Sequence, residues 1–194
     1  MTLPRAAKTS VLAGIGACWV ASLAYGFWAV REFESTPGAA AQAPQSWPAT
    51  SGIPRSERSA QLVMFVHPKC SCTRASLEEL AQVLKQLPAP VAAWIVIEGD
   101  TADSSGNDAL TAAMARLPHV GALYDSRGAE GRRFGALTSG HAVLYDATGT
   151  LRFSGGITGA RGHVGDNWGL RSLVAAGAHS GRDATIHAVY GCPL

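Results

Sequence analysis

An uncharged apolar stretch near the N-terminus places the strongest constraint on how this chain can fold. Residues 11–30 contain no Asp, Glu, Lys or Arg, and no side of a helix built from them would be polar. A helix of that length is about 30 Å long, which matches the hydrocarbon core of a bilayer. We therefore expect residues 11–30 to form a transmembrane helix rather than part of a soluble core.

The charges around this stretch predict its orientation. Arg5 and Lys8 precede it, whereas one arginine and two glutamates follow it within residues 31–34. Because the more basic side stays in the cytoplasm, the rest of the chain is expected on the other side of the membrane. The alternative is a cleaved signal peptide, but its apolar region is usually shorter, at about 7–15 residues. We expect an uncleaved signal anchor.

The rest of the chain divides by composition. Residues 1–10 are expected to be a cytoplasmic N-terminus, and residues 31–58, rich in proline and small residues, a flexible linker. Residues 59–194 are long enough for one globular domain. Cys18 lies inside the apolar stretch, where we expect it to pack without a catalytic role. The net charge is +2 with no long basic run, so no nucleic-acid partner is expected.

The globular part predicts an α/β fold. Apolar runs at 61–66 and 91–97 flank an amphipathic helix at 71–87, which is typical of a parallel βαβ unit. Two further runs at 142–146 and 151–153 predict an antiparallel hairpin. The other expected elements are helices at 107–117, 128–134 and 168–178 and extended segments at 120–124 and 185–190. This order is the thioredoxin arrangement, a central mixed β-sheet flanked by helices.

Two cysteines stand where the first strand meets the first helix of this domain. The free N–H groups and positive dipole of a helix N-terminus lower the pKa of a thiol at Cys70 or Cys72. Lys69 adds positive charge, and His67 could add charge or accept a proton. A disulfide between Cys70 and Cys72 closes a small ring, and a strained disulfide is easily reduced. We predict that Cys70 attacks and Cys72 resolves.

Two other interpretations of the cysteine pair remain open. Two thiolates with a nearby histidine suit the soft cation Cu(I). Such a site would use Cys70, Cys72 and His67, with His163 or Cys192 as further ligands. Alternatively, the two cysteines only pair with each other or pack in the core.

Cys192, the third residue from the C-terminal end, is a candidate third participant in the thiol chemistry. With Cys70 and Cys72 it makes an odd number of cysteines in a domain expected in an oxidising compartment, which suggests a further reactive thiol. If residues 185–190 dock as an edge strand, the tail brings Cys192 near the pair. Cys192 could then resolve a mixed disulfide, complete a metal site of three thiolates, or form a structural disulfide.

The glycine-rich segment 154–167 is a candidate active-site loop. In a thioredoxin-type sheet the last hairpin strand runs parallel to the first, so this loop leaves the sheet at the cysteine end. Arg161 could steady a thiolate or bind an anionic substrate, and His163 could be a base or a metal ligand. The alternative is a flexible surface loop.

Three segments, 67–77, 153–167 and 190–194, together resemble the RedB-like proteins, a bacterial group of the thioredoxin superfamily. The resemblance covers about residues 60–194. It implies a thioredoxin-like fold and a location in the bacterial envelope, with a single span in the inner membrane and the domain in the periplasm. The sequence departs from ordinary thioredoxins at two points: its motif is CxC rather than CxxC, and Thr138-Ser139-Gly140 stands where they place a cis-proline.

These observations favour a membrane-anchored thiol–disulfide oxidoreductase without a cofactor. Its expected partners are protein thiols and disulfides together with a separate redox partner. Cys70, Cys72 and Cys192 are the catalytic candidates, supported by His67, Lys69, Arg161 and His163. The alternative is a non-catalytic copper-binding or metallochaperone domain that holds Cu(I).

Overall fold

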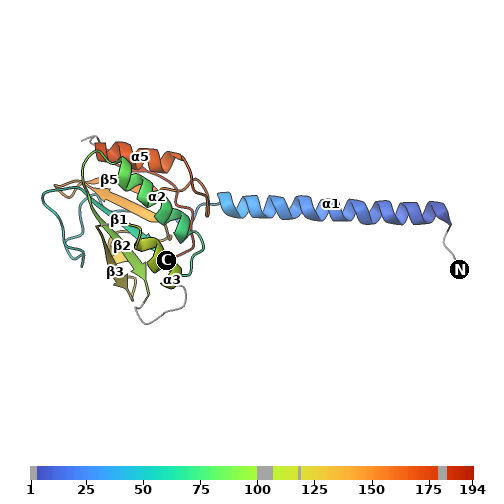
Figure 1. Ribbon diagram of the computed structural model, residues 1–194, viewed down its shortest axis with the longest axis horizontal. Coiled ribbons are helices and arrows are strands. Elements are labelled where there is room, and N and C mark those ends of the chain that lie inside the picture. Colours follow the sequence, from blue (N-terminus) through green and yellow to red (C-terminus); the bar gives the residue numbers. More distant parts are fainter. Residues whose placement is uncertain (1–3, 100–106, 118, 179–182) are drawn as a thin grey trace. The chain divides into compact units, whose positions relative to one another are not determined.

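A computed structural model describes residues 4–99, 107–117, 119–178 and 183–194, and the chain forms two compact units, 1–35 and 36–194 (Figure 1). The first unit is helix α1 (Arg5–Ser35). In the described ranges it is the one helix long and apolar enough to cross a membrane. It contains the span expected at 11–30 and extends beyond it at both ends. Its length and composition fit a membrane anchor, and a signal sequence has the same character.

The second unit is built on a six-stranded mixed sheet in the order β3-β2-β1-β4-β5-β6. Strand β1 pairs in parallel with β2, and β2 pairs in parallel with β3. The hairpin β4–β5 is antiparallel, and β4 is antiparallel to β1, so β5 runs in the direction of β1. The strands are β1 (Gln61–Val66), β2 (Ala92–Glu98), β3 (Val120–Asp125), β4 (His141–Tyr145), β5 (Leu151–Gly156) and β6 (Thr185–Ile186).

Helices cover both faces of this sheet. Apolar side chains of α2 (Thr73–Gln86), α3 (Asn107–Met114) and α5 (Trp168–Ala178) join those of one sheet face in a buried core. Helices α2 and α5 lie side by side on that face (Figure 1). The short helix α4 (Ala129–Arg133) leads into the second core, on the other face. The fold is thioredoxin-like, as expected, because the apolar periodicity of each element matches the face that it buries.

The prediction of a flexible linker at 31–58 is wrong, because residues 36–58 pack on the second face of the sheet. Ile53 is 2% exposed. The Trp47 ring lies 5.1 Å from that of Phe134 and 5.3 Å from that of Tyr145, at nearly perpendicular angles. The Tyr145 hydroxyl donates to the carbonyl of Pro44 at 2.9 Å. The apolar residues that pack on the sheet are unevenly spaced along this segment, so its sequence shows neither helical nor strand periodicity.

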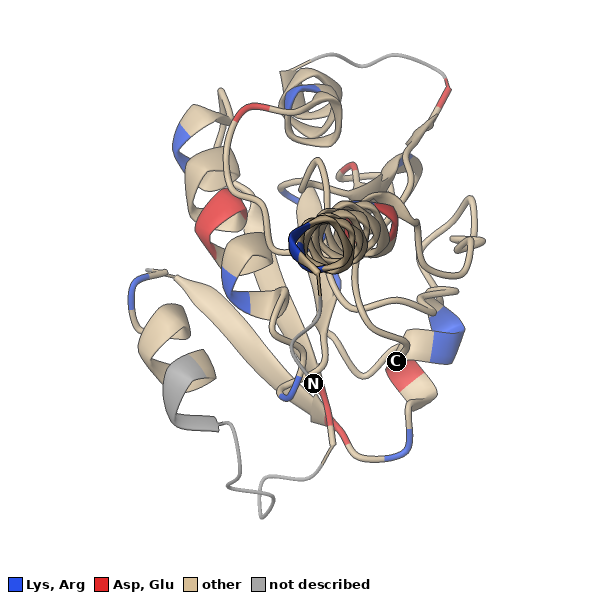
Figure 2. Ribbon diagram, turned by 90° about the vertical axis from the view of Figure 1, so that its right-hand side faces the viewer, with Lys and Arg blue, Asp and Glu red and all other residues tan. Residues whose placement is uncertain are grey.

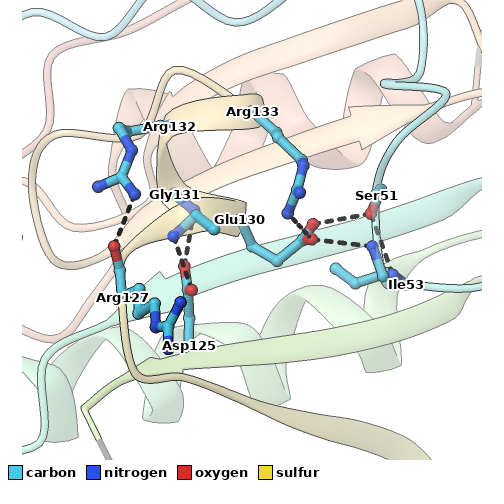
Figure 3. Close-up of polar contacts among 10 residues, drawn as sticks. Ser51, Ile53, Asp125, Arg127, Glu130, Gly131, Arg132 and Arg133 are labelled. Atoms are coloured by element: carbon cyan, nitrogen blue, oxygen red, sulfur yellow. Dashed lines mark hydrogen bonds and ion pairs between the residues drawn. The ribbon is translucent and has the colours of Figure 1, made fainter.

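A buried carboxylate fixes this segment to α4 (Figure 3). The Ser51 hydroxyl and the Gly52 N–H each donate to Glu130 at 2.8 Å. Arg133 donates to the same carboxylate at 2.6 Å, and this pairing offsets the cost of burying its charge. The globular unit therefore begins at residue 36.

Basic and acidic residues both occur along the described elements (Figure 2). Helix α2 carries an Arg74–Glu78 ion pair at 3.3 Å on its surface. Arg171 pairs with Asp166 and lies over the Trp168 ring at the start of α5. These exposed pairs contribute little to stability.

Candidate thiol site

A tight turn between β1 and α2 carries the two central thiols. The N–H of Cys70 donates to the carbonyl of His67, and the N–H of Thr73 donates to that of Cys70, both at 3.1 Å. Cys72 is the N-cap residue of α2. Both thiols are only 5% exposed. The strand cannot continue here because Pro68 has no N–H to donate to a neighbouring strand.

The C-terminal tail, residues 191–194, brings a third thiol to this turn. The N–H of Ser139 donates to the carbonyl of Cys192 at 2.8 Å, and that of Leu194 donates to the carbonyl of Leu137 at 3.1 Å. Thr138 and Pro193 form an antiparallel bridge between these bonds. The side chain and the backbone N–H of Cys192 both hydrogen-bond to the Cys70 sulfur. The edge strand expected in 185–190 is present as β6, next to β5.

Ser139 is a site residue that the sequence analysis did not single out. Its hydroxyl accepts a hydrogen bond from the N–H of His67 at 2.9 Å and lies 3.2 Å from the Thr73 hydroxyl. It also hydrogen-bonds to Cys70. No cis peptide bond occurs among the described residues, so a trans backbone with a serine hydroxyl stands where thioredoxins place a cis-proline. The sequence signal was the unusual Thr138-Ser139-Gly140 at that position.

The three thiols differ in how readily they lose a proton. Burial raises the pKa of Cys70, but hydrogen bonds from Cys192, the Cys72 N–H and Ser139 outweigh it and leave that pKa below its ordinary value. Burial and the negative charge on Cys70 raise the pKa of Cys72. Burial, the hydrogen bond to Cys70 and the same charge raise the pKa of Cys192 to about 11. Of the three thiols, Cys70 therefore loses its proton most readily.

The glycine-rich loop reaches the same site. The Arg161 guanidinium donates to the carbonyl of Gly191, directly before the third cysteine. Its positive charge favours the thiolate forms of Cys72 and Cys192. Further along the loop, the Gly165 N–H donates to the buried carboxylate of Glu79 on α2. The loop is thus fixed to both the tail and the helix that follows the cysteines.

The other three candidate residues, His67, Lys69 and His163, are less buried than Cys70 and Cys72. The Nδ1 atom of His67 accepts a hydrogen bond from the Lys69 N–H at 3.1 Å, within the turn itself. The side chains of Lys69 and His163 are exposed. Burial has the largest effect on the pKa of each thiol, and the other cysteines, Ser139, Ser71 and Arg161 follow it. Hydrogen bonds from Cys192, the Cys72 N–H and Ser139 favour the thiolate at Cys70.

The metal interpretation requires a compact group of ligands. Within 4–99, 107–117, 119–178 and 183–194, no group of three or more His, Cys, Asp or Glu side chains is arranged to hold a metal ion. Within the cluster, the thiols of Cys72 and Cys192 hydrogen-bond to the Cys70 sulfur.

Comparison with known proteins supports the fold. No family model and no curated protein matches the sequence. An uncharacterized conserved protein from Geobacillus kaustophilus is 16% identical, with a TM-score of 0.57 over 82% of this chain and 91% of its own. A hypothetical protein from Sinorhizobium meliloti is 19% identical, with a TM-score of 0.54 over 81% of this chain and 93% of its own. At such identities the likeness shows a shared fold and says nothing of activity.

Proposed function

We propose that this protein is a membrane-anchored thiol–disulfide oxidoreductase that acts through Cys70 and Cys72. One observation carries the proposal: the Cys70 sulfur accepts hydrogen bonds from neighbouring groups that favour its thiolate form. The thiolate, not the thiol, is the nucleophile in disulfide exchange.

In the first step, the Cys70 thiolate attacks one sulfur of a client disulfide. A bond forms between Cys70 and that sulfur, the client S–S bond breaks, and the second client sulfur leaves as a thiolate that takes a proton from water. Before the attack, the Cys72 N–H and the Ser139 hydroxyl hydrogen-bond to the Cys70 sulfur. Burial of this sulfur limits competing reactions with water-borne oxidants.

In the second step, Cys72 attacks the Cys70 sulfur of the mixed disulfide. The Cys70–Cys72 bond forms, the remaining client sulfur leaves as a thiol, and the client has gained two electrons while the protein has lost two. The charge on Cys70 that raised the pKa of Cys72 is absent in the mixed disulfide, so Cys72 loses its proton more readily at that stage. Arg161 favours the resulting thiolate. The same steps in reverse oxidise a client dithiol.

The apolar N-terminal helix supports an anchored location for this chemistry. Its flanking charges favour placement of the domain outside the cytoplasm, where disulfides persist. We extend the proposal to the periplasmic side of a bacterial inner membrane, in keeping with the resemblance to RedB-like proteins.

The test compares Cys70→Ser with Cys18→Ser in the full-length protein in detergent micelles. Reduced protein is mixed with dithiobis(nitrobenzoate), and the released coloured thiol is followed in time. Cys70→Ser should remove the fast phase, and Cys18→Ser should retain it. Retention of the fast phase in Cys70→Ser would contradict the assignment of the nucleophile. A parallel titration of the reduced protein with Cu(I) addresses the metal interpretation, since tight stoichiometric binding without exchange would favour a metallochaperone.

A further inference from the structure

The Cys70 sulfur has two sulfur neighbours, one from its own turn and one from the C-terminal tail. The Cys72 thiol hydrogen-bonds to it, and so do the thiol and the backbone N–H of Cys192. Sulfur atoms in such contact need only a small movement to reach the disulfide bond length of about 2.05 Å. Cys70 can therefore pair with either neighbour, and the two disulfides are alternatives because Cys70 forms one bond at a time.

The tail holds Cys192 in this position by contacts on both sides of it. The Gly191 carbonyl accepts from Arg161, and the Cys192 carbonyl accepts from the Ser139 N–H at 2.8 Å. The Leu194 N–H donates to a carbonyl before β4 at 3.1 Å, and the Leu194 side chain packs against the second core. Because these contacts already order the tail, a bond from Cys192 to the neighbouring sulfur costs little further conformational entropy.

A disulfide between Cys70 and Cys72 is the less favourable of the two alternatives. Cysteines separated by a single residue close a small ring, which resists the torsion angle that a disulfide prefers. A strained disulfide has a higher reduction potential and is more easily reduced. The hydrogen bonds within residues 67–73 also limit how far the turn can relax. A disulfide from Cys70 to Cys192 closes no such small ring.

We propose that Cys192 replaces Cys72 as the partner of Cys70 after each reaction with a client, so that the resting oxidised protein carries a Cys70–Cys192 disulfide. This inference rests on the proposed function, which supplies the oxidised pair. It also assigns a direction of electron flow. Because the transfer stabilises the oxidised protein, it favours reduction of client disulfides over oxidation of client dithiols.

The transfer is a disulfide exchange within one chain. Cys192 loses its proton to water, and its thiolate attacks the Cys70 sulfur of the Cys70–Cys72 bond. The Cys70–Cys192 bond forms, the Cys70–Cys72 bond breaks, and Cys72 leaves as a thiolate that takes up a proton. No electrons are gained or lost, so the step needs no external oxidant. The charge of Arg161 favours the thiolate forms of both the attacking and the leaving sulfur.

Cys192 acts after Cys72 in this scheme. Cys72 lies in the same turn as Cys70, two residues away. Burial is the largest of the causes that raise the pKa of Cys192 to about 11, and burial remains when Cys70 is part of a disulfide. The Cys192 thiolate is therefore scarce at neutral pH, and Cys72 releases the client before the tail thiol reacts.

The first test identifies the disulfide by mass spectrometry. Full-length reduced protein in detergent micelles is oxidised with one equivalent of dithiobis(nitrobenzoate), quenched with acid after increasing times, alkylated and digested with trypsin. Trypsin cuts on both sides of residues 70–74, so Cys70 and Cys72 share one peptide, and it places Cys192 in another. We expect the single-peptide disulfide to form first and then to convert into a bond between the two peptides, with the alkyl group on Cys72.

Gly191→Ala keeps all the thiols but moves the tail. A Cβ atom at this position would lie 1.9 Å from the Ser139 carbonyl oxygen, too close for backbone to accommodate. The ratio of the Cys192 disulfide to the Cys72 disulfide should therefore fall about tenfold, equivalent to ~1.4 kcal/mol. Gly159→Ala is the matched control, because its Cβ would lie 3.4 Å from the nearest atom, an ordinary contact, and it should leave the ratio unchanged.

The second test measures the reduction potential of Cys192→Ser in a dithiothreitol redox buffer. This variant has only the Cys70–Cys72 disulfide available, and its hydroxyl can still donate to Cys70. The equilibrium should shift about tenfold toward the reduced protein, a rise of ~30 mV for a two-electron couple. Loss of a hydrogen bond to the Cys70 thiolate would shift it the opposite way, because it would destabilise the reduced form. Cys18→Ser is the control and should keep the original potential.

The inference is overturned if the Cys70–Cys72 bond persists in the unaltered protein without conversion, or if Cys192→Ser has an unchanged or lower potential. Either result leaves the proposed function intact. Failure of Cys70 to form any disulfide would instead count against the proposed function. Should Gly191→Ala misfold, the potential of Cys192→Ser decides, because that substitution exchanges one small side chain for another.

Discussion

The cysteine turn and the C-terminal tail both bring thiols to one place, but they are held there by different means. The turn is local: hydrogen bonds within residues 67–73 shape it, and its two thiols are 5% exposed. The tail depends on partners far away in the sequence, residues 137–139 and Arg161, and its cysteine is partly exposed. The position of Cys70 and Cys72 is therefore set by neighbouring residues, whereas the position of Cys192 depends on partners distant in the sequence.

The largest expected effect separates the two neighbouring thiols. Cys72→Ser should extend the lifetime of the mixed disulfide between Cys70 and a client peptide, whereas Cys192→Ser should leave it short. A tethered thiol has an effective concentration of the order of mM, so against micromolar external thiol the lifetime should rise by about 100-fold or more. Mass spectrometry of quenched samples measures the adduct. A longer lifetime in Cys192→Ser, but not in Cys72→Ser, would make the tail cysteine the resolving thiol.

A smaller effect concerns the influence of the tail on the turn. Cys192→Ala removes a side-chain donor to the Cys70 sulfur, so it should raise the pKa of Cys70 toward its ordinary value. A hydrogen bond to a charged group contributes about 1.5–3 kcal/mol, so its loss should raise the pKa of Cys70 measurably. The pH dependence of alkylation at Cys70 measures it. Cys18→Ala is the control, and a downward shift in Cys192→Ala would contradict the hydrogen-bond direction.

The smallest expected effect comes from removing the positive charge of Arg161, which lies beside the tail. Arg161→Gln replaces the guanidinium with an uncharged amide and so removes the positive charge that favours thiolates at Cys72 and Cys192. At an effective dielectric constant near 20, a charge several ångströms away contributes about 1 kcal/mol or more, so decay of the mixed disulfide should slow about fivefold. The initial attack by Cys70 should change less. Arg171→Gln, in an exposed ion pair at the start of α5, is the control. Equal slowing of attack and decay would show that Arg161 acts on the whole loop instead.

The sequence was sufficient for the parts of the fold that are set locally. The apolar run of β1, the amphipathic pattern of α2 and the hairpin β4–β5 each show their buried face in their own residues, and all three are present. Because the strand is followed directly by the helix, the sequence also placed the turn with Cys70 and Cys72 between β1 and α2. The parallel direction of β5 and β1 also put the loop with Arg161 at the cysteine end, where the structure has it.

The parts that escaped prediction depend on contacts between distant residues. Residues 36–58 looked like a linker because Trp47 and Ile53 are isolated in sequence, yet both are packed against the second core. The role of Ser139 was missed because its hydroxyl meets Cys70 only through the pairing of strands far apart in the chain. The approach of the tail was foreseen only conditionally, since no local pattern fixes the partner of a terminal segment.

The order in which the cysteines react with an alkylating agent tests the central claim most directly. Full-length reduced protein in detergent is treated with limiting iodoacetamide at pH 7, and the modified cysteines are identified by mass spectrometry. The account predicts that Cys70 reacts first, although it is less exposed than Cys192, because its pKa lies below the ordinary value while that of Cys192 is raised to about 11. Reaction first at Cys192 or Cys72, with Cys70 left unmodified, would contradict it.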